Sequence, residues 1–401
     1  RSTPCSPVAA EPSGVRGRMV AMSDVYSELV GQDRVVATLR RAVAGGRHAM
    51  THAWLFTGPP GSGRSNAAKA FAAALQCPDG GCGHCEPCRT TLSGAHPDVT
   101  LVRTEQLSIG VKETREMVSR ANVAPVRGRY QIVVVEDADR VTERAADALL
   151  KGLEEPAART VWLLCAPNPD DVIITIRSRC RVVKLATPSD EAVTRLLVER
   201  DGIDGALAAH AARAAQGHIG RARGLARSEE ARIRRHEIVG LPAKLDTLTD
   251  CLVAAGNLVA AATAEAEEIC DPLDERELAA LKESLGVGGR GTRKPRHAQA
   301  AIRDLEEEHQ TRRKRMVRDA LDRVLTEFTT VFRDVLVRQT GADAPLINAD
   351  MADVIDRVAR SGSAEHSVRV LDQILVARTR LEGNVQPQLA LEALLVGMAG
   401  R

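Results

Sequence analysis

The sequence predicts an α/β domain with a parallel sheet, followed by a region that is helical to the end of the chain. Short apolar runs such as "HAWLFTG", "QIVVVEDAD" and "TVWLLCAP" alternate with amphipathic stretches between about Val30 and Leu185. This alternation is typical of buried parallel strands joined by crossover helices. A glycine-rich loop joins one of these strands to a helical stretch. From Pro188 onward, Ala, Leu, Arg and Glu recur at helical spacing and the strand-like runs stop.

The composition limits the classes of function. The chain has 401 residues, of which 44% are hydrophobic, so it can bury more than one core. A net charge of +2 gives no overall attraction for nucleic acid. Two Trp, two Tyr and four Phe offer few rings for base stacking, which argues against a single-strand binder. No apolar run reaches the roughly 20 residues that span a bilayer, and we expect a cytoplasmic protein.

Breaks in these patterns predict the domain organisation. Residues 1–22, rich in Ser, Pro, Gly and Arg, are expected to form a disordered leader. The α/β domain is expected at 23–187, with a small helical unit, the lid, at 188–240. A larger helical unit, the collar, is expected at 241–401, and its basic, glycine-rich stretch at 286–297 is predicted to be a flexible loop.

The residue spacing of the glycine-rich loop predicts a phosphate-binding loop. The segment "GPPGSGRS" follows the strand "WLFTG" and precedes the helical stretch "NAAKAFAAALQ". Backbone N–H groups of such a loop and the following helix N-terminus surround phosphates. The candidate nucleotide-binding residues are Gly58, Gly61, Gly63, Arg64 and Ser65. Arg64 stands where a lysine is usual, and a planar guanidinium does not simply replace an ammonium. An inherited phosphate-loop fold without turnover is therefore at least as well supported as hydrolysis. ATP and Mg²⁺, bound without turnover, are the candidate ligands, and whether the altered loop binds nucleotide stays open.

A second departure follows the apolar strand at Ile132 to Val135. The chain reads Glu136-Asp137 there, in place of the Asp-Glu order that usually holds magnesium and orients the attacking water. The extra methylene of Glu136 would displace its oxygens from the metal. Asp137 would reach less far toward the water, so this exchange weakens hydrolysis independently of Arg64.

Four cysteines form a candidate metal site. Cys77, Cys82, Cys85 and Cys88 have the spacing C-x4-C-x2-C-x2-C. Four thiolates on so short a loop can surround one tetrahedral Zn²⁺ and leave no open position for catalysis. Two disulfides are the alternative, which a cytoplasmic location disfavours. The sequence therefore predicts a structural zinc module inserted in the α/β domain.

The chain as a whole resembles the AAA+ clamp-loader subunits of bacterial DNA polymerase III, from about Leu29 to Leu395. This resemblance implies an AAA+ domain with lid and collar, and a role in loading the sliding clamp for DNA replication. It also implies a hetero-oligomer with ATPase subunits of gamma or tau type and a delta subunit, which meets the sliding clamp and primer-template DNA through the complex. The segments that carry it are "LVGQDRV", the phosphate loop with its four-cysteine insert, "GAHPDV", "AADALLKGLEEP", "IRSRC" and "NVQPQLALEALL".

Four positions separate the active gamma or tau type from the delta-prime type, which generally does not drive turnover. All four favour delta-prime, so we expect this chain's own ATPase activity to be absent or weak. An active ATPase of gamma or tau type remains the alternative. The departures are Arg64, the exchanged Glu136-Asp137, Ala166-Pro167 at the polar sensor position, and Gly220 at the lid arginine position, next to Arg221.

The tripeptide Ser178-Arg179-Cys180 keeps the family pattern. The resemblance implies that Arg179 reaches into the nucleotide site of the adjacent subunit as an arginine finger. A guanidinium supplied in trans can stabilise the charge that develops on the γ-phosphate. The alternatives are a local salt bridge or a general basic edge with Arg177 and Arg181.

Two stretches of the collar allow further predictions. Opposite charges four residues apart, such as Glu308 and Arg312, predict that the basic stretch Gln310 to Arg318 forms a solvated helix face. DNA contact there, or a zinc-containing nucleic-acid-binding module as the whole function, is the less supported alternative. The stretch "ALDRVLTEFTTVFRDVLVR" has an apolar stripe that we expect to need a partner subunit.

Overall fold

The computed structural model describes most of the chain, including all of the predicted strands and the four cysteines of the candidate zinc site. The leader predicted at 1–22 lies outside the described residues, as does most of the loop predicted at 286–297. Helix α12 already begins at Arg296, so the end of that predicted loop is helical. The described residues are 24–45, 49–104, 108–285, 296–383 and 385–400.

A five-stranded parallel sheet forms the centre of the first domain, which confirms the predicted fold class. The strand order is β2-β3-β4-β1-β5. Every strand pairs in parallel with its neighbours, so the carboxyl ends of all strands lie at one edge. Segments that follow β1 and β3 therefore meet there. The strands are β1 (Ala53–Thr57), β2 (Val99–Val102), β3 (Gln131–Val135), β4 (Thr160–Ala166) and β5 (Arg181–Lys184).

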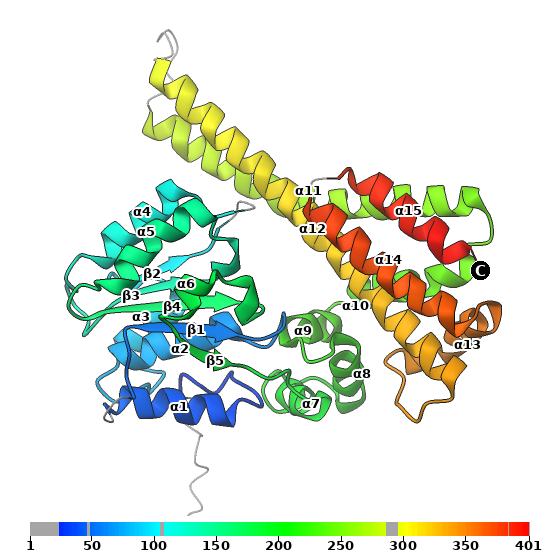
Figure 1. Cartoon of the computed structure of the whole chain (residues 1–401), viewed down its shortest axis with the longest axis horizontal. Coiled ribbons are helices and arrows are strands. Elements are labelled where there is room, and N and C mark those ends of the chain that lie inside the picture. The colour runs from blue at the N-terminus through cyan, green and yellow to red at the C-terminus, as the bar shows by residue number, and fades with distance from the viewer. Residues whose placement is uncertain (1–23, 46–48, 105–107, 286–295, 384, 401) are drawn as a thin grey trace, which may run out of the picture.

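Helices cover both faces of this sheet (Figure 1). On one face, Trp54 and Phe56 of β1 pack with Phe71 of α2 in one core cluster. On the other face, Leu149 of α5 packs with Trp162 of β4 in a second cluster. Because β1, β3 and β4 are buried on both faces, they appear in the sequence as unbroken apolar runs. The covering helices are α1 (Asp33–Val43), α2 (Arg64–Gln76) and α3 (Glu86–Ser93), opposite α4 (Val111–Ala121) and α5 (Glu143–Glu154), with the short α6 (Ile174–Arg177) before β5.

Three short helices form the lid core. They are α7 (Asp190–Glu199), α8 (Gly205–Ala215) and α9 (Ile219–Arg227). Alanines of α8 and α9 pack with Val193 and Leu197 of α7, and the small side chains let the helices approach closely. The next helix, α10 (Glu229–Gly240), contributes Val239 to the core of the collar instead. The chain therefore passes from lid to collar along α10.

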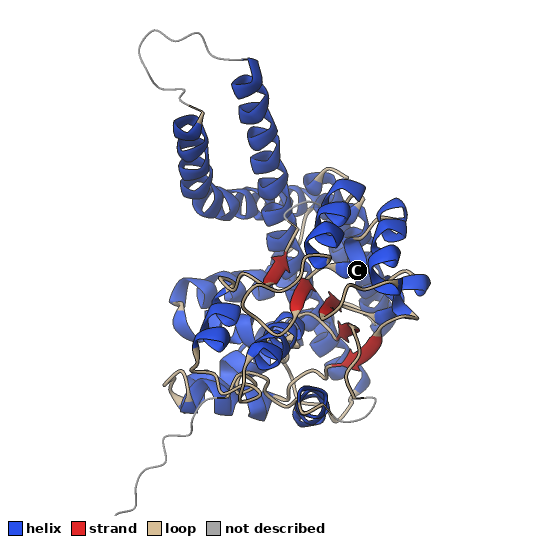
Figure 2. Cartoon of the chain, turned by 90° about the vertical axis from the view of Figure 1, so that its left-hand side faces the viewer, coloured by secondary structure: helices blue, strands red, loops and turns tan. Residues whose placement is uncertain are grey.

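The collar is built on two long helices. Helices α11 (Leu248–Ser284) and α12 (Arg296–Thr340) run side by side and project beyond the rest of the molecule (Figures 1 and 2). Figure 2 shows that α11 is bent, and it contains Pro272, which removes a helix hydrogen bond. Helices α13 (Ala352–Ser361), α14 (Ala364–Glu382) and α15 (Pro387–Ala399) pack against the lower part of this pair. No helix of the described ranges is long and apolar enough to cross a membrane.

The apolar stripe predicted for α12 is present, but the expectation that it needs a partner subunit was wrong. Leu321, Leu325, Phe328 and Phe332 are buried within the collar core. The covering residues come from the chain itself, including α11, α13, α14 and α15. A sequence pattern shows that a helix face must be covered, but it does not show by which chain.

The prediction that Gln310 to Arg318 forms a solvated helix face is confirmed only in part, since Gln310 and Lys314 are exposed but Arg312 is buried. Arg312 is only 8% exposed and pairs with Glu277 of α11, not with Glu308 on its own helix. Arg313 pairs with Asp271 and Asp274 of α11. These basic residues bind the two long helices together, so the charge run serves packing between helices.

Candidate functional site

The phosphate loop lies between the carboxyl end of β1 and the first turn of α2. Gly61 and Gly63 have φ values of +83° and +88°, which favour glycine because a Cβ is strained there. The lid touches this loop directly. A Cβ added at Gly61 would lie 2.3 Å from Cγ of His218, so only glycine allows this approach. The structure thus brings the predicted loop, the α2 N-terminus and the lid together.

Arg64 turns back on its own loop. Its guanidinium donates a hydrogen bond to the carbonyl oxygen of Gly58, at the start of the loop. Burial lowers the pKa of Arg64, while the negative charges of nearby groups, including Asp139 and Asp137, oppose this shift. Ser62 Oγ is buried without a hydrogen-bond partner among the described residues. The cation that would face phosphate is therefore engaged with the loop itself.

Glu136, the first residue of the exchanged acid pair, is already paired. Lys69 Nζ lies 2.7 Å from its Oε1, and Arg103 Nε lies 3.8 Å from its Oε2. Lys69 stands one turn beyond Ser65 on α2 and so projects from the same face of that helix. The carboxylate that would hold magnesium is therefore already paired with Lys69 of the same chain. Sequence reasoning missed Lys69, although its spacing from Ser65 is a signal that could have indicated it.

Asp137, the second acid, contacts the collar. Arg315 of α12 places its guanidinium 3.5 Å from Asp137 Oδ2 and also donates to the carbonyl oxygen of Thr104, which follows β2. Arg315 comes from a helix 178 residues further along the chain. No local sequence signal could have predicted this contact.

Ala166-Pro167 and Gly220 stand at the two positions where the family resemblance implies polar sensor residues. Ala166 is buried at the end of β4, and the carbonyl oxygen of Pro167 accepts a hydrogen bond of 3.1 Å from the Gly58 backbone N–H. Gly220 lies in the first turn of α9. Arg221 beside it forms an ion pair with Glu327 of α12, so its guanidinium is engaged by the collar.

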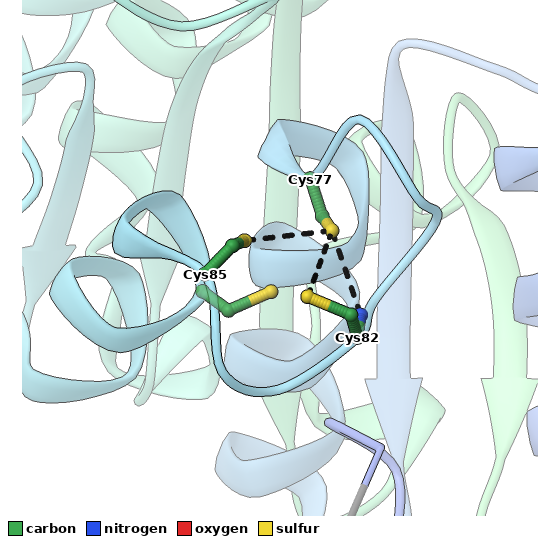
Figure 3. Close-up of side chains that lie close together, drawn as sticks. Cys77, Cys82 and Cys85 are labelled. Carbon is green, nitrogen blue, oxygen red and sulfur yellow. Dashed lines mark hydrogen bonds between the residues drawn. The ribbon is translucent and has the colours of Figure 1, made fainter. Parts of the chain in front are cut away.

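The four cysteines converge at the far end of α2. Figure 3 shows Cys77, Cys82 and Cys85 of this cluster. Cys77 Sγ lies 3.7 Å from Cys82 Sγ and 3.6 Å from Cys85 Sγ. All four sulfurs, that of Cys88 included, lie within 4.8 Å of one another, and none forms a disulfide. Zn–S bonds of about 2.3 Å in a tetrahedron require sulfurs about 3.8 Å apart. The residues therefore fit one zinc ion with four thiolate ligands.

The surroundings favour a thiolate at Cys77 but not at Cys88. Burial raises the pKa of Cys77, but hydrogen bonds from the backbone amides of Cys82, Gly81 and Asp79 outweigh it and lower the pKa to about 6. Burial raises the pKa of Cys88, and a bound metal is what would hold such a buried thiol as thiolate. Cys77 ends α2 and Cys85 precedes α3, so a zinc ion would tie these two helices together.

Arg179 lies on the surface, and its side chain is 38% exposed. It pairs with Glu154 at the end of α5, with 2.5 Å between Nη2 and Oε1. It also donates to the carbonyl oxygen of Thr175, at 2.8 Å. The neighbouring Ser178 donates to the same oxygen, at 3.0 Å, whereas Cys180 is largely buried, which raises its pKa to about 12. The tripeptide thus presents its arginine outward.

The sheet register separates Arg179 from this chain's own phosphate loop. Arg181, the first residue of β5, pairs with Trp54 near the start of β1, and Lys184 pairs with Thr57 at its end. The phosphate loop follows Thr57, so it lies at the carboxyl edge of the sheet and Arg179 at the amino edge. Of the flanking arginines, Arg181 packs over the Trp54 ring at 5.0 Å.

Two family models match the chain. One, described as "DNA polymerase III, delta subunit", matches residues 31–189, and "DNA polymerase III, delta subunit, C terminal" matches residues 317–399. A "DNA polymerase III subunit delta'" of Bacillus subtilis is 32% identical over 173 residues, covering 42% of this chain and 52% of that protein. A "subunit delta'" of Pseudomonas aeruginosa is 37% identical over 158 residues, covering 38% and 48%. The chain belongs to the DNA polymerase III clamp-loader family.

Relatives named gamma/tau also match the chain. "DNA polymerase III subunit gamma/tau" of Mycobacterium bovis is 38% identical over 159 residues, covering 38% of this chain and 27% of that protein. The chain therefore spans about half or less of the curated relatives it matches. A gamma subunit-related protein of Thermotoga maritima has a TM-score of 0.41 and 16% identity, covering 91% of this chain and 99% of that one.

Proposed function

We propose that this clamp-loader subunit is of delta-prime type and does not drive turnover itself. It supplies Arg179 to the ATP site of a neighbouring subunit during loading of the sliding clamp. One observation carries the proposal: the charged groups at its own nucleotide site are tied to other groups of the chain, whereas Arg179 is exposed at the opposite edge of the sheet.

The contacts of three side chains support the proposed absence of turnover. Arg64 is bonded to the Gly58 carbonyl oxygen, so it is not free to follow a transferring phosphoryl group. Glu136 is neutralised by Lys69, which competes with magnesium. Asp137 is paired with Arg315 and cannot readily orient a water. Phosphoryl transfer depends on positioned charges of this kind, so these contacts oppose it.

The trans role of Arg179 is supported by its position. The only carboxylate paired with it among the described residues is Glu154, which is itself 47% exposed. A surface ion pair contributes about 0–1 kcal/mol, so a neighbour's phosphate can replace Glu154 at little cost. The guanidinium would then stabilise charge on the γ-phosphate of ATP bound by the neighbour.

Zinc is proposed as a structural component. Cys77, Cys82, Cys85 and Cys88 would hold it, and it would cross-link α2 and α3 without an open coordination position. The proposed partners are ATPase subunits of gamma or tau type and a delta subunit, with the sliding clamp and primer-template DNA met through the complex. The proposed location is the cytoplasm.

An active ATPase of gamma or tau type is the second candidate. The identity of 38% with the Mycobacterium bovis gamma/tau subunit favours it. Purified chain and a reconstituted complex separate the two. Negligible ATP hydrolysis by the chain alone, together with clamp loading that requires it in the complex, supports the delta-prime type. Hydrolysis by the chain alone at about 1 per second, a rate common for enzymes, supports the second candidate.

A further inference from the structure

Arg221 connects the lid to the collar through a buried ion pair. Its guanidinium binds Glu327 of α12, with side-chain exposures of 16% for the arginine and 7% for the glutamate. The two residues lie 106 positions apart in the chain. Both line a cavity of about 1730 Å³ that is also bordered by Pro59 and Pro60 of the phosphate loop. The arginine therefore stands beside the phosphate loop but is bound by the collar.

Glu327 is held from the collar side by a buried network. Arg235 of α10 is 5% exposed and places its Nε 3.2 Å from Glu327 Oε2. Arg235 also donates to the side-chain oxygen of Asn348. Asn348 in turn donates to Asp334 Oδ2 at 3.0 Å and to Thr330 Oγ1 at 3.2 Å. The acceptor for Arg221 is thus fixed in position by the collar.

At the other end of this connection, His218 contacts the phosphate loop. His218 caps α9, since its Nδ1 accepts a hydrogen bond of 3.2 Å from the backbone N–H of Arg221. Burial and the positive charge of Arg221 lower the pKa of His218, so the ring is neutral near pH 7. The ring lies against Gly61, where even a Cβ would not fit.

We propose that the Arg221–Glu327 ion pair makes the collar hold α9 against the phosphate loop, so that the lid stays closed without nucleotide. Three contacts in series carry this: Glu327 fixes Arg221, the first turn of α9 connects Arg221 to His218, and His218 covers Gly61. A buried pair resists separation because removing one partner leaves an uncompensated charge in a poorly solvated site. The inference concerns the chain's own lid and does not depend on the trans role of Arg179.

Amide hydrogen exchange of the full chain, without nucleotide or added magnesium and without chelator, tests the proposal. Glu327→Gln keeps the shape of the side chain and removes its charge. Exchange in the first turn of α9 and in the phosphate loop should become at least about tenfold faster, while exchange in α14 and α15 stays unchanged. His218→Ala breaks the other end of the connection, so exchange should rise in the phosphate loop and at the Arg221 amide, which loses its cap, and remain slow in α12 around Glu327.

Asp322→Asn is the matched control. It also converts a carboxylate of α12 to an amide, but the pair that it breaks, with Arg378 of α14, lies within the collar. It should leave exchange in α9 and the loop unchanged. If Glu327→Gln disturbs folding, Arg221→Lys serves instead, with a smaller rise in the same two segments. Unchanged exchange in the lid and loop would overturn the proposal. Equal acceleration throughout the collar would also overturn it, because Glu327 would then only stabilise the collar.

Discussion

The two edges of the sheet use arginine in opposite ways. At the carboxyl edge, Arg64 is partly buried and bonded to the backbone of its own loop. At the amino edge, Arg179 is exposed and paired with a surface glutamate. A partly buried guanidinium bonded to its own loop is difficult to redirect, whereas the exposed contacts of Arg179, to Glu154 and to the Thr175 carbonyl oxygen, can be replaced at small cost. The comparison supports the proposal that the carboxyl edge does not drive turnover and that the amino edge acts on a neighbouring subunit.

The largest effect is expected from removal of the proposed zinc ion. Chelation of the metal, or Cys82→Ser, removes an interaction that can amount to about 10 kcal/mol in a small zinc module. Hydrogen exchange should rise between Cys77 and Cys88 and at the ends of α2 and α3. Metal analysis of protein purified without chelators should give one zinc per chain. A metal content near zero would contradict the zinc assignment, and ATP turnover that follows zinc occupancy would contradict its structural role.

The next effect tests the amino edge. Arg179→Ala should leave the subunit folded and the complex assembled, and it should slow hydrolysis at the adjoining ATPase site by up to about 10³-fold. Clamp-stimulated ATPase and clamp loading of reconstituted complexes measure this. Arg179→Lys should rescue poorly, because a point charge does not reproduce the guanidinium fork.

Arg177→Ala is the matched control for Arg179. Arg177 lies two residues away, but its guanidinium is bound by Asp170 and the carbonyl oxygen of Pro169 in the same chain. Its replacement should have a mild effect on the neighbour's ATPase. Wild-type rates with Arg179→Ala, or equal losses with both variants, would eliminate the finger assignment.

A smaller effect is expected at the carboxyl edge. Arg64→Lys restores the usual loop residue but leaves Glu136 paired with Lys69 and Asp137 paired with Arg315. The purified variant should therefore stay well below about 1 turnover per second. A steady-state ATPase assay with wild type in parallel measures this. Recovery of enzyme-like turnover by this single change would show that the acid pair is still functional.

The smallest effect concerns the carboxylate that holds Arg179. Glu154→Gln removes a surface ion pair, so the free energy of unfolding should change by no more than about 1 kcal/mol. The neighbour's ATPase rate should stay within about twofold of wild type, since Arg179 keeps its backbone acceptor at Thr175. A loss as large as that of Arg179→Ala would mean that Glu154 itself is required at the subunit interface.

Local patterns in the sequence determined the parallel sheet, the phosphate loop and the four-cysteine cluster. Each depends on residues close together in the chain, such as the apolar run of β3 or the spacing from Cys77 to Cys88, so short-range rules of burial and ligand geometry suffice. The exchanged order of Glu136 and Asp137 could also be recognised from the sequence, because the two residues are adjacent in the chain.

Only the tertiary structure decided which charges meet at these elements. Arg315 reaches Asp137 across 178 residues, and Arg221 reaches Glu327 across 106. The collar basic run was predicted to be solvated because helix spacing offered Glu308 as a partner, yet Arg312 is buried against Glu277 of another helix. A charged side chain takes the partner that packing brings within reach, and when it is buried the cost of lost solvation makes that pairing necessary. Sequence spacing carries no information on such long-range partners.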